Sequence, residues 1–141
     1  MTNSFSTLGK SAVKKARERG IKAGLLRLRL IRPFPDDDIK NALKGRKAVA
    51  VIDQNISVGK GGIIYQEIAG ALYNEKERPL LLSFIGGLGG KNISPGEFEF
   101  IFESMERAVN TGEIPPPQLL YTEAEWKEME RLKKIAGKSG D

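Results

Sequence analysis

The amino-acid sequence predicts an α/β fold, a three-layer αβα sandwich around a mostly parallel sheet. Two apolar runs, the continuous residues 48–52 and residues 80–85, which only Ser83 interrupts, are typical of strands that are covered on both faces. Segments with helical periodicity alternate with these runs along the chain. The connections between the runs are long enough for the crossovers that parallel pairing requires.

The first two predicted elements are a helix and a strand. Over residues 8–19, apolar residues recur at helical spacing while lysines and arginines face elsewhere, so this segment predicts an amphipathic helix. After Gly20, leucines alternate with arginines, which predicts a strand over residues 25–31. Pro33 and Pro35 end that strand because each proline lacks an amide donor and restricts the residue before it.

The middle of the chain predicts two further helices. Three aspartates at residues 36–38 open a short helix that runs through Leu43, since acidic residues in a first turn complement the helix dipole. The loop at residues 53–62 follows the first apolar run. A helical pattern then covers residues 63–73.

The last third begins with a clear helix start. Ser94 is a good N-cap and Pro95 suits the first helical position, so they predict a helix over residues 95–109. A stiff spacer of three prolines at residues 115–117 separates it from a final helix over residues 122–135.

We therefore divide the chain into two parts. Residues 1–112 form the predicted α/β domain. Residues 113–141 hold the proline spacer, the C-terminal helix and a frayed tail that begins at Gly137.

The composition excludes several kinds of chemistry. None of the 141 residues is cysteine or histidine. The chain therefore has no disulfide framework, no thiolate ligands for zinc or iron–sulfur clusters, and neither the commonest general base nor the commonest transition-metal ligand. Any chemistry within this chain would have to use carboxylates, Lys, Ser, Thr or Tyr, which is a poor set of groups for catalysis.

Hydropathy and charge predict the compartment of the protein and the kind of partner that it contacts. No apolar run approaches the roughly 20 residues of a membrane-spanning helix, so we expect a cytoplasmic protein without membrane contact. The net charge of +5 divides into a basic segment (residues 1–31) and an acidic segment (residues 97–130), which favours polar contact with partner proteins. Only Phe5 accompanies the basic residues, so the pattern argues against nucleic-acid binding, which needs interleaved aromatics.

Two glycine-rich loops follow the two buried strands. At residues 57–62 the exposed amides could hold an anion at a helix N-terminus, with Lys60 adding charge, but we favour tight helix–sheet packing. Four glycines at residues 86–90 imply positive φ angles or close approach to a ligand or a neighbouring subunit, and we favour the subunit.

Two other features have more than one interpretation. The aspartates at residues 36–38 suit a solvated helix start better than a metal site, because no second carboxylate cluster is placed to complete a coordination shell. Trp126, Met129 and Leu132 lie roughly along one helix face, either as a docking stripe for a partner or as ordinary packing onto the domain.

Four segments, in this order, resemble a known family. They are residues 20–31, the motif Arg32-Pro33-Phe34-Pro35, residues 49–55 with Gly59, Gly61 and Gly62, and residues 84–93. Together they are similar to the C-terminal domain of the α subunit of 2-oxoacid:ferredoxin oxidoreductases, most of all pyruvate:ferredoxin oxidoreductase (pyruvate synthase). The resemblance covers about residues 3–110.

The resemblance implies a function and a set of partners. Enzymes of this family decarboxylate a 2-oxoacid on thiamine diphosphate, pass two electrons through iron–sulfur clusters to ferredoxin and form an acyl-coenzyme A. Their C-terminal domain is transketolase C-terminal-like and structural, so the resemblance implies no catalytic residue, cofactor site or metal site in this chain. Thiamine diphosphate, Mg²⁺ and the clusters are thus expected in other domains or subunits, namely the pyrimidine-binding, thiamine-diphosphate-binding and cluster-bearing ones.

The chain departs from the family pattern at both ends. In the family a strand that ends in Gly-Ser precedes the first helix and lies inside the sheet, whereas Asn3-Ser4 stands at that position here with two residues before it. We therefore expect the domain to lack one internal strand at its N-terminus. The segment 115–141 matches no part of the family pattern.

The leading hypothesis is a non-catalytic, subunit-interface domain of such an oxidoreductase. The alternative is a free-standing α/β module that binds an anionic ligand at its two glycine loops. The candidate interface residues are Arg32, Pro33, Phe34, Pro35, Gly59, Lys60, Gly61, Gly62, Gly86, Gly87, Gly89, Gly90 and Trp126.

Overall fold

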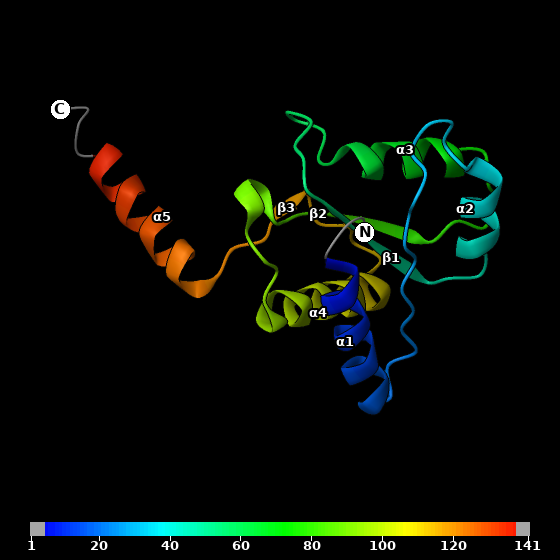
Figure 1. The fold of residues 1–141 in the computed structure, drawn as a ribbon, viewed down its shortest axis with the longest axis horizontal. Coiled ribbons are helices and arrows are strands. Elements are labelled where there is room, and N and C mark those ends of the chain that lie inside the picture. Colours follow the sequence, from blue (N-terminus) through cyan, green and yellow to red (C-terminus); the bar gives the residue numbers. More distant parts are fainter. Residues whose placement is uncertain (1–4, 138–141) are drawn as a thin grey trace.

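A computed structural model describes residues 5–137 of the chain and shows three layers, with helices on both faces of a small sheet (Figure 1). The elements in chain order are α1 (Phe5–Glu18), α2 (Asp36–Leu43), β1 (Ala48–Asp53), α3 (Ile63–Leu72), β2 (Leu80–Ile85), the 3₁₀ turn η1 (Leu88–Gly90), α4 (Pro95–Thr111), β3 (Gln118–Leu119) and α5 (Glu123–Ala136).

The sheet has three parallel strands in the order β1-β2-β3. Ala48 pairs with Leu80 and Asp53 with Ile85, so β1 and β2 end at the same edge. All three strands therefore present their carboxyl ends, and the loops that follow them, on one side of the molecule. The predicted α/β class and parallel sheet are confirmed.

Each face of the sheet carries its own apolar core. On the face covered by α1 and α4, the completely buried Leu82 and Phe84 pack with Ile101 of α4. On the face covered by α2 and α3, Val51 and Leu81 pack with the buried apolar residues of both helices. The prediction that both apolar runs are covered on two faces is thus confirmed, as expected for near-continuous hydrophobic strands.

The strand predicted over residues 25–31 is wrong. The segment runs from the α1 and α4 layer to the α2 and α3 layer (Figure 1), and it belongs to no strand. A strand exists only with a ladder partner, and none of the described strands pairs with this segment. The alternating leucines of this segment do not share one buried face. Leu28 is buried against α2 and α3, while Leu26 and Leu30 remain 40% and 50% exposed.

The structure adds one strand that the sequence analysis missed. Gln118 and Leu119 follow the three prolines directly and pair with Phe84 and Ile85. The next residue, Leu120, is buried in the core beside α4. The packed body therefore includes these residues, which the sequence analysis placed with the spacer.

The predicted starts of α4 and α5 agree with the structure, whereas α1 begins at Phe5, three residues before its predicted start. Ser94 accepts a hydrogen bond from the Glu97 amide, Glu97 in turn accepts one from the Ser94 amide, and Pro95 opens α4. Thr122 and Glu125 form the same reciprocal cap at α5. Every helix in the described part of the chain is too short or too polar to cross a lipid bilayer. Most of the predicted frayed tail, residues 138–141, lies outside the described residues.

Candidate functional site

A buried carboxylate joins the end of β1 to the start of α3. Asp53 is 1% exposed and accepts hydrogen bonds from the amides of Ile64 (3.0 Å) and Tyr65 (3.1 Å). Burial raises the pKa of Asp53 above its usual value, and the two amide bonds only partly offset that effect. The last residue of a core strand thus caps the helix that follows it.

The first glycine loop is shaped by this cap. Asn55 accepts a hydrogen bond from the Ile63 amide at 2.8 Å, so three successive amides at the start of α3 are bonded within the chain. A Cβ on Gly62 would lie only 2.0 Å from Oδ2 of Asp53, and one on Gly61 would lie 2.7 Å from Oγ of Ser83. These amides are therefore not free to bind an anion, and both glycines allow close helix–sheet packing.

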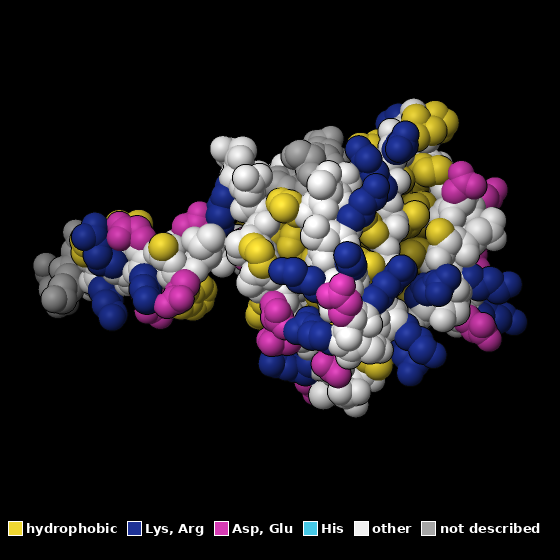
Figure 2. Space-filling model, turned by 60° about the horizontal axis from the view of Figure 1, so that its bottom comes forward, with side chains coloured by type: hydrophobic (Ala, Val, Ile, Leu, Met, Phe, Trp, Pro, Cys, Tyr) yellow, Lys and Arg dark blue, Asp and Glu magenta, His cyan; other side chains and the backbone are white. Residues whose placement is uncertain are grey.

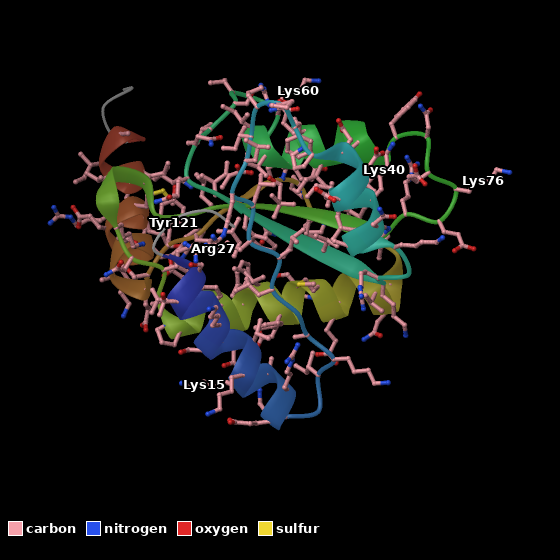
Figure 3. The ribbon with its side chains drawn as sticks, turned by 45° about the vertical axis from the view of Figure 1, so that its right-hand side comes forward. Lys15, Arg27, Lys40, Lys60, Lys76 and Tyr121 are labelled. Atoms are coloured by element: carbon pink, nitrogen blue, oxygen red, sulfur yellow. The ribbon has the colours of Figure 1, made fainter. Side chains whose placement is uncertain are left out.

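The outer part of the same loop faces solvent. Ser57 donates its amide to the Gly61 carbonyl at 2.7 Å, and Gly59 has a φ of +73° with open space around it. Lys60 extends away from the body at the tip of the loop (Figure 3). Val58 is 92% exposed, which is unusual for an apolar side chain.

The second glycine loop leaves β2 and contacts the first. The Gly86 amide donates to the Asp53 carbonyl at 2.9 Å, and Gln54 donates its side-chain amide to the Gly87 carbonyl at 3.5 Å. A Cβ on Gly86 would meet Leu120 at 2.8 Å, so this glycine too permits close packing.

Three glycines of the second loop adopt conformations that favour glycine. Gly87, Gly89 and Gly90 have φ of +73°, +67° and +81°. A Cβ on Gly89 or Gly90 would meet nothing within 4 Å. The chain reversal, rather than local crowding, requires glycine at these two positions.

The carboxyl edge of the sheet carries a set of exposed apolar side chains. We call it the strand-end surface, and its members are Ile56, Val58, Leu88 and Leu119, each at least 41% exposed. They follow or end the three neighbouring parallel strands, so the topology places them on one side of the molecule. Exposed apolar side chains gathered at one edge of a sheet are candidates for contact with another protein.

The Arg32–Pro35 motif lies beside α2 and α3 instead. Arg32 forms an ion pair with Glu67 of α3 at 2.5 Å, and Phe34 packs against the core between α2 and α3. Pro33 is exposed, and Pro35 directly precedes α2. Thus the structure does not bring this motif together with the glycine loops.

Lys91 links the second glycine loop to both C-terminal helices. Its ammonium pairs with Glu97 at 3.4 Å and also with Glu125 in the first turn of α5. The hydrogen bond from Lys91, together with the one from the Thr122 amide, lowers the pKa of Glu125 to about 2. The start of α5 is thereby fixed to the start of α4.

A pH titration tests this link. Because the pKa of Glu125 is depressed, its stabilising contribution is full above about pH 4.5 and is lost as the pH falls toward 2. Replacing Lys91→Met removes the ammonium, so we expect the pKa of Glu125 to rise toward 4.5. NMR titration of the Glu125 carboxyl carbon measures this shift, and an unchanged pKa would show that the ion pair does not form in solution.

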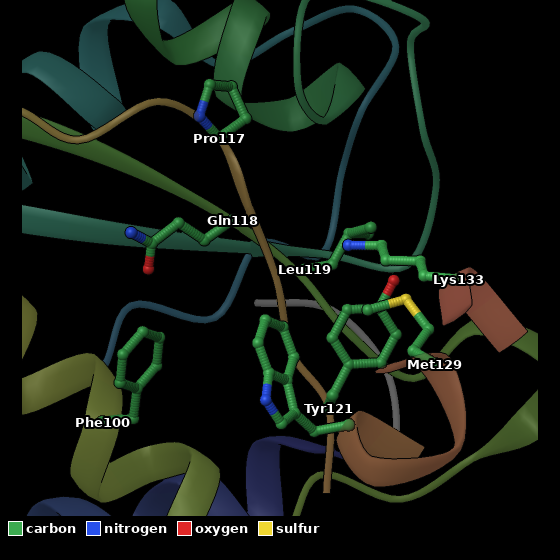
Figure 4. Close-up of a pocket in the computed structure, with 8 residues that line it drawn as sticks. Phe100, Pro117, Gln118, Leu119, Tyr121, Met129 and Lys133 are labelled. Carbon is green, nitrogen blue, oxygen red and sulfur yellow. The ribbon is translucent and has the colours of Figure 1, made fainter. Parts of the chain in front are cut away.

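Trp126 lies in a groove between α5 and the body. The groove measures about 440 Å³, and Phe100, Leu119, Tyr121 and Met129 also line it (Figure 4). Trp126 is 50% exposed, with Tyr121 at a ring-centroid distance of 6.4 Å and the Lys133 ammonium 6.0 Å from its ring. The two interpretations of this stripe, docking or packing, both remain open because the side chain is half covered.

Charged groups in the described residues do not converge on a metal site. No group of three or more carboxylates lies close enough together to hold an ion in residues 5–137. The basic side chains of Lys15, Arg27, Lys40 and Lys76 lie on different elements and point in different directions (Figure 3).

The sequence analysis missed one important residue of this region. Asp53 was recognised only as part of a motif, although a signal was available: an aspartate ends a buried strand, and two glycines precede the next helix. Such an arrangement allows the carboxylate to approach the helix amides closely.

Comparison with known proteins identifies the family. Residues 1–98 match the family described as pyruvate:ferredoxin oxidoreductase core domain II. The chain belongs to this family. The resemblance found in the sequence to 2-oxoacid:ferredoxin oxidoreductases is thereby confirmed.

Individual relatives carry names from the same group of enzymes. The chain is 34% identical over 122 residues to the ketoisovalerate oxidoreductase subunit VorA of Pyrococcus abyssi, with 86% of this chain and 29% of the relative covered. It is 37% identical over 119 residues to the pyruvate synthase subunit PorA of Pyrococcus horikoshii (80% and 30% covered). It is 41% identical over 107 residues to PorA of Methanothermobacter thermautotrophicus (74% and 27%). The chain thus spans less than a third of the length of these relatives.

Proposed function

We propose that this chain is a structural, subunit-interface domain of a cytoplasmic, thiamine-diphosphate-dependent 2-oxoacid:ferredoxin oxidoreductase, with pyruvate as the preferred substrate. The complex oxidatively decarboxylates the oxoacid to an acyl-coenzyme A and passes the electrons to ferredoxin. This chain supplies packing and contact surfaces, and the other subunits or domains supply the chemistry. Membership of the pyruvate:ferredoxin oxidoreductase core domain II family supports the enzyme class.

The strand-end surface is the observation that carries the interface role. It presents exposed apolar side chains on β3 and on two loops that Asp53 bonds at their bases, since its carboxylate accepts from the start of α3 and its carbonyl accepts from Gly86. A rigid apolar surface loses little conformational entropy when a partner covers it. The glycine loops thus position a contact surface and do not need a small ligand of their own.

The residues present do not fit the cofactors of the family. The two buried carboxylates of the described residues, Asp53 and Glu97, are already bonded to backbone amides at helix starts. Among the described residues, no three Asp or Glu side chains lie close enough together to form a site for the Mg²⁺ that accompanies thiamine diphosphate. We therefore assign thiamine diphosphate, Mg²⁺ and the iron–sulfur clusters to other parts of the complex.

A pull-down from extract of the source cells tests the proposal. The tagged chain should recover the thiamine-binding and cluster-bearing subunits, together with reduction of a viologen dye that depends on a 2-oxoacid and coenzyme A. The oxoacid that gives the fastest reduction identifies the substrate. Recovery of the chain alone, without partners or activity, would reject the subunit role.

Charged substitutions on the strand-end surface test the interface itself. Val58→Glu and Leu88→Glu each place a carboxylate where a partner covers an apolar side chain, so we expect the recovered activity to fall by at least about tenfold, the effect of about 1.4 kcal/mol. Tyr73→Glu is the matched control, because Tyr73 is 74% exposed and lies at the end of α3 on the opposite edge of the sheet. Equal recovery with all three variants would show that this surface is not the interface.

A further inference from the structure

The outer side of β1 is an unprotected strand edge. β1 pairs with β2 on one side, and no other strand of residues 5–137 lies beyond it. Prolines, charges and bulges are the usual devices that protect an edge from further pairing. The stretch from Ala48 to Ile52 is entirely apolar and keeps a regular register with β2, so it carries none of these devices. The opposite edge differs, because β3 has two residues and directly follows three prolines.

Half of the main-chain groups of β1 point toward this open edge. The carbonyl of Lys47 accepts a hydrogen bond from the Leu80 amide at 3.0 Å, so the odd-numbered residues of this stretch face β2. Successive residues of a strand direct their amides and carbonyls to alternate sides, and those of Ala48 and Ala50 therefore point outward. Both residues are half-buried, and none of their outward groups bonds to the described part of the chain. A partner that covers this edge has to bond these groups, because unpaired buried amides and carbonyls are costly.

The segment between α1 and α2 crosses beside β1 in both ribbon views (Figures 1 and 3). Leu28 anchors it in the same core cluster as Val51 of β1. No hydrogen bond joins the main chain of this segment to that of β1 within the described residues. The segment therefore passes the open edge without completing the sheet.

The same segment carries cations that have no counter-charge. Arg27 and Arg29 are exposed, and neither forms an ion pair with another residue in the described range. Leu26 and Leu30 beside them are 40% and 50% exposed. Figure 2 shows basic and apolar side chains next to one another on the body. A partner that covers this segment has to supply carboxylates, because a buried charge without a counter-charge is strongly unfavourable.

These features specify the chemistry of the partner. Only an extended segment can pair with a strand edge, because a helix already bonds its own main-chain groups. Residues 25–31 of a second copy of this chain are poor candidates, since they would place arginine against arginine. The partner is therefore a different polypeptide that carries both acidic and apolar side chains.

We propose that the open edge of β1 is paired by an extended segment of a partner protein, whose carboxylates contact Arg27 and Arg29. Main-chain hydrogen bonds to the outward groups of β1 provide the contact, as in other cases of β-strand addition. This contact goes beyond the proposed function. It runs along the side of the sheet, whereas the strand-end surface lies where the strands end.

Hydrogen exchange tests the main-chain pairing. The tagged full chain is measured alone and in the complex that it recovers from the source cells, with single-residue resolution by mass spectrometry. The amides of Ala48 and Ala50 should exchange at least about tenfold more slowly in the complex, because each gains a hydrogen bond. The amides of Val49 and Val51 face β2 in both states and are the internal control. Equal changes at the two pairs of amides would overturn the proposal, as would recovery of the chain without a partner.

Charge reversal tests the predicted carboxylates. Arg27→Glu and Arg29→Glu should each lower the amount of partner recovered by about tenfold, because like charges then face each other. Both side chains are exposed and unpaired in the described structure, so the variants keep the fold, which circular dichroism of the free chain checks. Lys76→Glu is the matched control, since Lys76 is exposed and points away from the body, far from Arg27 (Figure 3). Equal recovery with all three variants would overturn the acidic partner.

The readouts separate this inference from the proposed function. Hydrogen exchange reports pairing at the edge of β1, whereas dye reduction reports the enzyme complex. Selective slowing at Ala48 and Ala50 without dye reduction would reject the enzyme role and retain strand addition. Dye reduction by a complex without selective slowing would do the reverse.

Discussion

Gly62→Ala is expected to be strongly destabilising. The added Cβ would lie 2.0 Å from Oδ2 and 2.2 Å from Cγ of Asp53, both of which are buried. Asp53 cannot move aside without breaking its bonds to the amides of Ile64 and Tyr65. Overpacking and the loss of these charge-assisted bonds together lower the free energy of unfolding by about 3 kcal/mol or more. Urea denaturation followed by circular dichroism measures the change.

Gly70→Ala is the matched control for this variant. Gly70 lies inside α3, and a Cβ there would meet nothing within 4 Å. The substitution should therefore raise the free energy of unfolding by about 0.5–1 kcal/mol, the usual gain from glycine to alanine in a helix. If the two variants had similar stabilities, the close approach of Gly62 to Asp53 would not exist in solution.

Asp53→Asn is expected to have the second large effect. Asparagine has one acceptor oxygen where the carboxylate has two, so an amide at the start of α3 loses its partner and faces an NH₂ group. An unsatisfied buried donor costs about 1–3 kcal/mol. Slow hydrogen exchange at the amides of Ile64 and Tyr65, measured by NMR, should be lost at one of the two positions. Retention of both protected amides would argue against the cap.

The pH dependence of stability gives an independent check of Asp53. Burial raises the pKa of Asp53 in the folded chain. The free energy of unfolding of the wild type, measured relative to that of Asp53→Asn, is therefore highest below about pH 3.8. That advantage declines as the pH rises through the folded pKa and the buried carboxyl ionises. Denaturant titrations of both proteins at several pH values should show this narrowing difference, and a difference that widens with pH would contradict it.

Local signals in the sequence predict those helices and strands whose ends are marked by characteristic residues. Ser94 and Pro95 mark the start of α4, and the apolar run 80–85 is the strand β2 without a change of bounds. Both depend on short-range chemistry, namely capping and two-sided burial. The strand predicted over residues 25–31 fails because alternation is a local property, whereas a strand requires a neighbour that only the whole fold supplies.

The contacts within the candidate site cannot be predicted from local sequence patterns. β3 is two residues long and follows three prolines, so no periodicity is available to predict it. Asp53 meets the amides of α3 eleven and twelve residues later, through a loop whose path the sequence does not specify. The interface role of the glycine loops and of Trp126 stays a prediction, although the structure shows where each of them lies.

The link between the two glycine loops has a consequence for their motion. The carboxylate of Asp53 bonds α3, its carbonyl accepts from Gly86, and its neighbour Gln54 reaches Gly87. We therefore expect the two loops to open together, because opening one of them breaks bonds that hold the other. A partner that binds only the first loop should then slow hydrogen exchange in the second loop as well.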